Sequence, residues 1–153
     1  MKIVGVSMSY NDGFKLKEWK EHYEEYKDDL DCFVVVDNGS DEDYSKELEH
    51  VFGEEAIIIK RDKNGGCTAA YNEGIKYALE KTDADAIIII GNDIKVCKDC
   101  IPNLYHYLYS DKSLGIVSAA MLYINSDIVE DFGHNVEGLN ICLLYTSPSP
   151  RDS

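Results

Sequence analysis

The polar side chains best suited to chemistry fall at the ends of short apolar runs. Ser9 and Tyr10 close one run, Asp37 closes another, and Asn92 and Asp93 follow a third. Hydroxyl, amide and carboxylate groups can hydrogen-bond a nucleobase or a ribose, and a carboxylate can also hold a divalent cation. These residue types in these places are candidates for a ligand-binding site.

The segment around Asp37 reads Val-Val-Val-Asp-Asn-Gly-Ser-Asp over residues 34–41. A carboxylate at the end of a strand can accept a hydrogen bond from a base N–H or a ribose hydroxyl. The same residues are also common caps of a turn or of the following helix. On this segment alone, both interpretations stay open.

Residues 64–75 form a glycine-containing stretch, Asn-Gly-Gly-Cys-Thr-Ala-Ala-Tyr-Asn-Glu-Gly-Ile. Small residues let a backbone approach a ligand, and the start of a helix offers free N–H groups to phosphate. The spacing fits neither the P-loop nor the dinucleotide fingerprint. The alternative is a tight strand-to-helix connection with close packing and no ligand.

Asp93 lies just past four successive isoleucines, residues 87–90. A run that is apolar on both faces predicts a central parallel strand. A carboxylate beyond such a strand is well placed to hold a hard divalent cation, which can bridge a diphosphate and stabilise it as a leaving group. The alternative is an aspartate that only makes a turn.

Strands and helices that alternate along the chain must position these residues. The hydrophobic pattern predicts strands at 3–9, 32–37, 56–60, 85–90 and 115–122, and helices at 16–30, 43–52, 67–81 and 102–109. This order predicts an open, mostly parallel α/β sheet, in which ligands bind at the carboxyl ends of the strands.

The composition is that of one globular domain with an acid excess. The 153 residues are 44% hydrophobic, and 15 Lys and Arg stand against 29 Asp and Glu, for a formal charge of -14. This charge argues against nucleic acid or an anionic membrane as the main partner. Five cysteines and the lack of a signal-like start indicate a reducing cytoplasm, and the longest apolar run is too short for a transmembrane segment.

Taken in order, the polar motifs resemble glycosyltransferase family 2, which has the GT-A fold. The resemblance rests on residues 9–11, 35–41, 64–75 and 91–93, and residues 114–134 are similar to rhamnosyltransferase-like members. It covers nearly all of residues 3–137. It implies a GT-A (Rossmann-like) α/β fold with a mostly parallel sheet flanked by helices, truncated at the carboxyl terminus.

The resemblance also implies an activity, the inverting transfer of a sugar from a nucleotide-diphosphate sugar to a glycan, lipid-linked or protein acceptor. It places the enzyme in the cytoplasm, peripheral to the inner face of the membrane. Tyr10 would lie against the nucleobase, and Asp37 would bind the base or the ribose. The donor-binding residues implied are Ser9, Tyr10, Asp37, Asn64, Asn72 and Asn92.

Asp93 is the implied ligand of a divalent cation, Mg or Mn. Such a cation would also offset the repulsion between an acidic chain and an anionic donor. Gly91 departs from the family, which has an acidic or amide residue at this position of the triplet. Asp93, the donor diphosphate and water would then hold the cation without a second side chain.

The general base of the reaction is expected beyond Ile141, in an acceptor-binding half that this sequence lacks. Residues 142–152, from Cys142 to Asp152, read as the translation of a transposase sequencing adapter. We therefore expect a nucleotide-sugar-binding half over residues 1–141 and a non-native tail over residues 142–153.

Two other classes of function stay open. One is a non-catalytic nucleotide-binding α/β module that lost its chemistry with Gly91. The other is a sugar nucleotidyltransferase, which needs a glycine-rich basic loop after the first strand. Residues 7–14 contain one glycine and no arginine, which disfavours this class.

Overall fold

The computed structural model describes residues 2–123 and 128–131, which fall into two units, one up to Leu114 and one from Gly115 onward. The second unit holds β5 (Met121–Leu122) and β6 (Val129–Asp131). The first unit alternates strands and helices in the order β1 (Ile3–Ser9), α1 (Gly13–Tyr26), the 3-10 turn η1 (Lys27–Asp29), β2 (Cys32–Asp37), α2 (Glu42–Phe52), β3 (Ile57–Lys60), α3 (Cys67–Lys81), β4 (Ala86–Ile89) and α4 (Cys100–Ser110).

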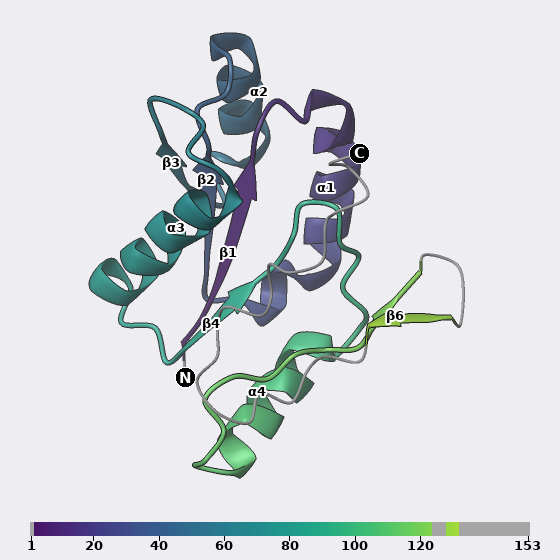
Figure 1. The fold of residues 1–153 in the computed structure, drawn as a ribbon. Helices are drawn as coiled ribbons and strands as arrows, with labels where there is room; N and C mark the ends of the chain where they lie inside the picture. The colour runs from purple at the N-terminus through teal and green to yellow at the C-terminus, as the bar shows by residue number, and fades with distance from the viewer. Residues whose placement is uncertain (1, 124–127, 132–153) are drawn as a thin grey trace. The chain divides into compact units, whose positions relative to one another are not determined.

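The first unit is built on a four-stranded sheet with the order β3-β2-β1-β4 (Figure 1). Every pair of neighbouring strands is parallel, with Val6 opposite Val34 on one side and Ile89 on the other. Each strand is followed by a helix, which fits the crossover connections that parallel strands need. The predicted α/β fold class, with a GT-A-like parallel sheet flanked by helices, is confirmed.

Helices cover both faces of this sheet. Side chains alternate along β2, so that Phe33 and Val35 face one core and Val34 faces the other. Helices α1 and α2 pack on the first face through Trp19 and Phe52, whose ring centroids lie 4.6 Å apart. Helix α3 packs on the second face. Because the helices lie on the faces of the sheet, the carboxyl ends of the strands are followed by loops.

Close contact between α3 and the sheet depends on a glycine. A Cβ atom at Gly74 would lie 2.5 Å from Cγ1 of Val6 and 3.1 Å from Cγ2 of Val36. Ala70, Gly74 and Ala78 are all buried, one helical turn apart. The small residues of the 64–75 stretch therefore serve packing, as one of its two interpretations requires.

Two expectations about the strands are wrong in the described residues. Residues 115–120 are not a strand, and β5 pairs antiparallel with β6 in a separate sheet. An apolar run becomes a strand only where a partner backbone lies alongside, and Ile116 is 88% exposed. β4 is the end strand of the described sheet and not a central one. The prediction was wrong because apolar side chains on both faces show only that both faces of the strand are covered, and not that strands flank it on both sides.

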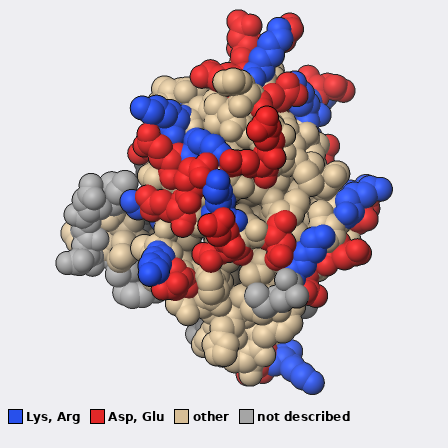
Figure 2. Space-filling view, turned by 180° about the vertical axis from the view of Figure 1, so that it is seen from behind, with Lys and Arg blue, Asp and Glu red and all other residues tan. Residues whose placement is uncertain are grey.

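Ion pairs occupy much of the surface, and Figure 2 shows acidic and basic side chains interleaved on one face. In one group, Nζ of Lys20 lies 2.7 Å from Oε1 of Glu24, and Nζ of Lys27 lies 2.6 Å from Oε2. Hydrogen bonds from Lys20 and Lys27 lower the pKa of Glu24. Such exposed pairs contribute little stability each, and they spread the acid excess over the surface.

No helix within residues 2–123 and 128–131 is long and apolar enough to cross a membrane. The expected tail at residues 142–153 and the expected position of the base beyond Ile141 lie outside the described residues.

Candidate functional site

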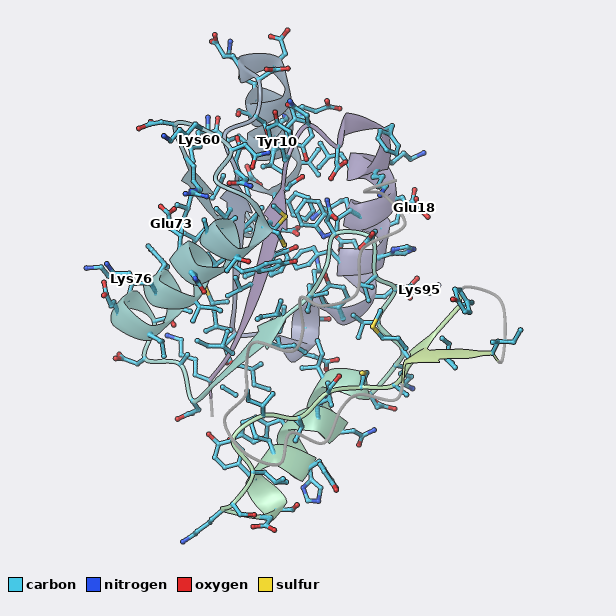
Figure 3. The ribbon with its side chains drawn as sticks, in the orientation of Figure 1. Tyr10, Glu18, Lys60, Glu73, Lys76 and Lys95 are labelled. Carbon is cyan, nitrogen blue, oxygen red and sulfur yellow. The ribbon has the colours of Figure 1, made fainter. Side chains whose placement is uncertain are left out.

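Loops after four parallel strands leave the sheet at one edge, which we call the carboxyl edge. Backbone hydrogen bonds between neighbouring strands continue just past the ends of the strands. The N–H of Asn38 donates to the carbonyl of Ser9 at 2.9 Å, and the N–H of Arg61 donates to the carbonyl of Asp37 at 2.9 Å. Figure 3 shows Tyr10 and Lys60 at this same end. The topology therefore brings the predicted strand-end residues to one edge, as expected for a ligand site in such a sheet.

Ser9 and Tyr10 at the end of β1 face different surroundings. Ser9 is fully buried, and its hydroxyl shares a hydrogen bond with the hydroxyl of Tyr44 on α2. Tyr10 is 42% exposed. Ser9 therefore braces the strand against α2, whereas a ligand can reach Tyr10.

The loop after β1 is tied to the loop after β2. The N–H of Asn11 donates to Oγ of Ser40 at 3.1 Å, and the N–H of Asp41 donates to Oδ1 of Asn11 at 3.0 Å. Asn11 has φ 50°, a left-handed conformation that asparagine tolerates. This exchange fixes the two loops relative to each other.

Asp37 is 1% exposed at the end of β2. Its Oδ1 accepts a hydrogen bond from the N–H of Ser40 at 3.0 Å, and its Oδ2 accepts one from the hydroxyl of Ser45 on α2. The carboxylate thus holds the turn and the start of α2, as the capping interpretation requires. Its predicted contact with a base or ribose stays a prediction.

Asn38, the next residue, is also fully buried and contacts the glycine loop, residues 64–66. Its Nδ2 donates to Oδ1 of Asn64 at 3.0 Å and to the carbonyl of Gly66 at 3.3 Å, and its Oδ1 accepts from the N–H of Gly65 at 3.2 Å. Asn64 also accepts from the N–H of Gly66 at 2.8 Å. The predicted residue Asn64 is exposed at the carboxyl edge, and its side chain is held in place by the buried Asn38.

Arg61 is a member of this edge that the motif analysis did not single out. Its Nη1 donates to Oδ1 of Asn38 at 2.7 Å, and its Nε lies 2.9 Å from Oε2 of Glu73 on α3. The signal was present in the sequence, because Arg61 directly follows the predicted strand at residues 56–60.

The loop after β4 carries Asn92 and Asp93. Nδ2 of Asn92 donates to Oδ2 of Asp12 at 2.9 Å, which links the loops after β4 and β1. Asp93 is half exposed, and its Oδ2 lies 3.9 Å from Nζ of Lys15 on α1. Both predicted residues are therefore at the carboxyl edge, close to an ammonium group.

The residues around Asp93 supply only part of the ligand set that a divalent cation needs. Within the described ranges, no three His, Cys, Asp or Glu side chains are grouped to hold a metal ion. A Cβ at Gly91 would lie 3.0 Å from Oδ1 of Asp93, so a side chain there would touch this carboxylate. Asp93 alone could hold Mg or Mn only with further ligands from a donor diphosphate and water, as in sites that use one or two carboxylates plus substrate phosphates.

Tyr71 on α3 is close enough to Asp93 to respond to its charge. Burial, and then the charges of Cys67 and Asp93, raise the pKa of Tyr71 to about 12. The phenol is therefore neutral at physiological pH and keeps its proton to donate.

Asn72 is the predicted residue that is not brought to the edge with the others. It is exposed on α3, two residues from Ala70 and Gly74, whose side of the helix packs on the sheet. Two residues correspond to about 200° around a helix, so Asn72 lies on the side away from the sheet. Its role in a donor pocket stays a prediction.

A hollow of about 370 Å³ lies beside the carboxyl edge, between the loop after β1 and α2. It is lined by Asn11, Gly13, Asp41, Asp43, Tyr44 and Glu47. The three carboxylates would repel a diphosphate, so this hollow is a poor place for the phosphates of a nucleotide.

The chain is similar to a known protein family, to a curated protein and to a solved structure. The sequence model of "Glycosyl transferase family 2" matches residues 8–141. The low-salt glycan biosynthesis hexosyltransferase Agl10 of Haloferax volcanii is 27% identical over 90 residues, which are 59% of this chain and 28% of that protein. A crystal structure of S. aureus TarS 1-349 is similar with a TM-score of 0.56 and 17% identity, over 71% of this chain and 32% of that one.

These matches differ in what they establish. The chain spans less than a third of both relatives, 28% of the hexosyltransferase and 32% of TarS. The likeness to TarS shows the fold alone. The family match, in contrast, covers most of the sequence and includes each predicted strand-end motif. The chain belongs to glycosyl transferase family 2.

Proposed function

We propose that the chain is the nucleotide-sugar-binding part of an inverting glycosyltransferase that moves a hexose onto a glycan. The observation that carries the proposal is the convergence of Tyr10, Asn64 and Asp93 on one edge of a parallel sheet. The hexose and the glycan are inferred from the Haloferax relative, which is a hexosyltransferase of low-salt glycan biosynthesis. We also propose that the enzyme is cytoplasmic, which its five cysteines support because thiols stay reduced there, and that it lies at the inner face of the membrane.

In this proposal, the exposed ring of Tyr10 stacks on the nucleobase and Asn64 hydrogen-bonds the donor. The glycine loop lets the donor approach the backbone at the start of α3. Asn92 aligns the loop after β4 through its bond to Asp12.

Asp93 would hold a Mg or Mn ion together with the donor diphosphate. The cation would neutralise charge on the leaving nucleoside diphosphate. The ammonium of Lys15, 3.9 Å from Asp93, supplies a second positive charge toward the same phosphates. This charge supports the proposal, because the whole chain, Lys15 included, carries a formal charge of -14, and an anionic donor needs positive charge close to its phosphates.

The acceptor hydroxyl must lose a proton to a base as it attacks the anomeric carbon. We assign this base to residues beyond Ile141 of the intact protein, and we assign residues 142–153 to a non-native tail. The nucleotide record tests the tail, because codons other than those of the adapter would contradict the assignment.

The activity is tested with the protein encoded by the uninterrupted gene. Release of nucleoside diphosphate from a panel of nucleotide sugars is followed with Mg or Mn and with a chelator. We expect one donor to be consumed with cation present, and Asp93→Asn to lose most of this rate while Asp28→Asn, an exposed aspartate in η1, keeps it.

The outcomes separate the proposal from its rival. Binding of a nucleoside diphosphate without turnover supports the non-catalytic module, for which the missing side chain at Gly91 is the favouring observation. No turnover and no binding of any nucleoside diphosphate would overturn the proposed function.

A further inference from the structure

We infer that Arg61 is a positioning residue for donor binding, which acts by setting the amide orientation of Asn38 and thereby the shape of the glycine loop. This inference rests on the proposed function for its ligand, but its structural part is tested without one. Arg61 directly follows β3, and its side chain is 19% exposed. It joins β3, the loop after β2 and helix α3.

The guanidinium group makes three separate contacts. Nη1 donates to Oδ1 of Asn38 at 2.7 Å, and Nε pairs with Oε2 of Glu73 at 2.9 Å. The group also lies against Gly65, because a Cβ built there would be 2.7 Å from both Nη atoms. The planar fork of arginine can bond two partners at once, which a single ammonium cannot do in the same geometry.

Asn38 uses its whole hydrogen-bonding capacity in this network. Its Oδ1 accepts from Arg61 and from the N–H of Gly65, and its Nδ2 donates to Asn64 and to the carbonyl of Gly66. A side-chain amide has two donors and one oxygen with two acceptor sites, so all of them are occupied.

Arg61 helps to decide which way this buried amide points. An arginine can only donate, so it requires the Oδ1 of Asn38 on its side. The Nδ2 must then face Oδ1 of Asn64, which places the NH₂ group of Asn64 away from Asn38. With Arg61 removed, Oδ1 of Asn38 keeps only the N–H of Gly65 as a donor, so the amide is held in this orientation less firmly.

The consequence reaches the start of α3. Gly66 is the residue before α3, with φ 84°, and its carbonyl accepts from Nδ2 of Asn38 at 3.3 Å and from the N–H of Ala70 at 3.2 Å. The orientation of Asn38 thus controls both Asn64 and the first turn of the helix. In a donor-binding enzyme, these are the groups that meet the ligand.

The structural part is tested by amide hydrogen exchange of this chain without ligand. We expect Arg61→Ala to speed exchange at Gly65 and Gly66 by about tenfold, since a buried hydrogen-bonding group loses a partner. Exchange at Val34 and Val35 in β2 should not change. The matched control is Lys60→Ala, which removes the preceding cation and its pair with Glu49 at 2.9 Å.

The ligand part uses UDP, dTDP and GDP with Mn as probes, measured by calorimetry well below the melting temperature. We expect Arg61→Ala to weaken the tightest of these by about tenfold, Arg61→Lys to recover part of the loss, and Lys60→Ala to change it by less than about twofold. A purely structural role would lower the melting temperature without changing the affinity of the folded protein.

The results distinguish two failures. If the wild type binds no nucleoside diphosphate, the proposed function is overturned. Faster exchange at Gly65 in Arg61→Ala would still support the hydrogen-bond network around Asn38 in that case. Unchanged exchange and unchanged affinity in Arg61→Ala overturn the inference. If Arg61→Ala does not fold, Arg61→Lys decides, because unchanged exchange and affinity in that variant contradict a role for the fork.

Discussion

The two halves of the carboxyl edge are built differently. In what we call the closed half, residues 37–41 and 61–66, Asn38 is fully buried and its amide is saturated with hydrogen bonds. In the open half, residues 9–12 and 91–93, Tyr10 and Asp93 are exposed and the Lys15–Asp93 pair is 3.9 Å long. The closed half is cross-linked by hydrogen bonds before any ligand binds, whereas exposed polar groups in the open half are accessible to a ligand.

This difference indicates a division of labour. A preorganised surface loses little entropy when it binds, so the closed half is suited to selecting the donor. A half-exposed carboxylate with an ammonium beside it can rearrange around phosphates and a cation. Variants in the closed half should therefore cost stability as well as donor affinity, whereas variants in the open half should change ligand or cation binding with little loss of stability.

The largest effect is expected where the two loops of the closed half touch. Gly39 has φ 78°, and a Cβ there would lie 2.3 Å from the carbonyl carbon of Lys63. Gly39→Ala should lower the free energy of unfolding by at least about 3 kcal/mol, from backbone strain plus the clash. Urea denaturation measures the loss.

Gly66→Ala is the matched control for Gly39→Ala. Gly66 has a similar φ of 84°, but a Cβ there meets nothing within 4 Å. It should lose only the backbone term, about 1–3 kcal/mol. Equal losses in both variants would show that the loops are not in tight contact.

The next effect concerns the buried amide. Asn38→Ala leaves the N–H of Gly65 and the guanidinium of Arg61 without their acceptor, and should cost about 2–3 kcal/mol in urea denaturation. Asn72→Ala is the control, because Asn72 is exposed on α3 and should change stability by less than about 0.5 kcal/mol. A small loss at Asn38 would mean that the closed half is not rigid.

A smaller effect is expected on cation affinity in the open half. Gly91→Asp adds a carboxylate next to Asp93, and should tighten Mn binding by about tenfold, or about 1.4 kcal/mol. Electron paramagnetic resonance of free Mn measures the affinity. The neutral variant Gly91→Asn has nearly the same shape, and an equal gain in that variant would argue against the added charge as the cause.

The smallest effect is expected for Lys15→Met. The Lys15–Asp93 pair is exposed and long, so its loss should change the free energy of unfolding by less than about 0.5 kcal/mol. Thermal or urea denaturation provides the comparison. A loss above about 1 kcal/mol would show that the open half is structural, which contradicts its contrast with the closed half.

Much of the fold could be predicted from the sequence, because buried faces of helices and strands require apolar residues at regular spacing. Helix α3 begins at Cys67 and ends at Lys81, as the pattern predicts. The end position of β4 in the described sheet could not be predicted, since it depends on pairing between distant segments.

The site could be predicted less fully than the fold. Ligands bind at the carboxyl ends of parallel strands, and this rule led to Asn64 and Asp93. A sequence motif does not tell which way a side chain at the end of a strand faces. Asp37 is buried and bonds the turn and α2, which was one of the two interpretations that the sequence left open. Arg61 was missed because its partners, Asn38 and Glu73, come from separate segments.

The central claim is that the carboxyl edge binds the nucleoside diphosphate of a sugar donor. It is tested most directly by titrating the ¹⁵N-labelled chain with UDP, dTDP and GDP plus Mg while amide chemical shifts are recorded. The account predicts that one nucleotide shifts the resonances of Tyr10, Gly65, Gly66 and Asp93 together. No shift with any nucleotide, or shifts confined to the acidic hollow around Asp43 and Glu47, would contradict it.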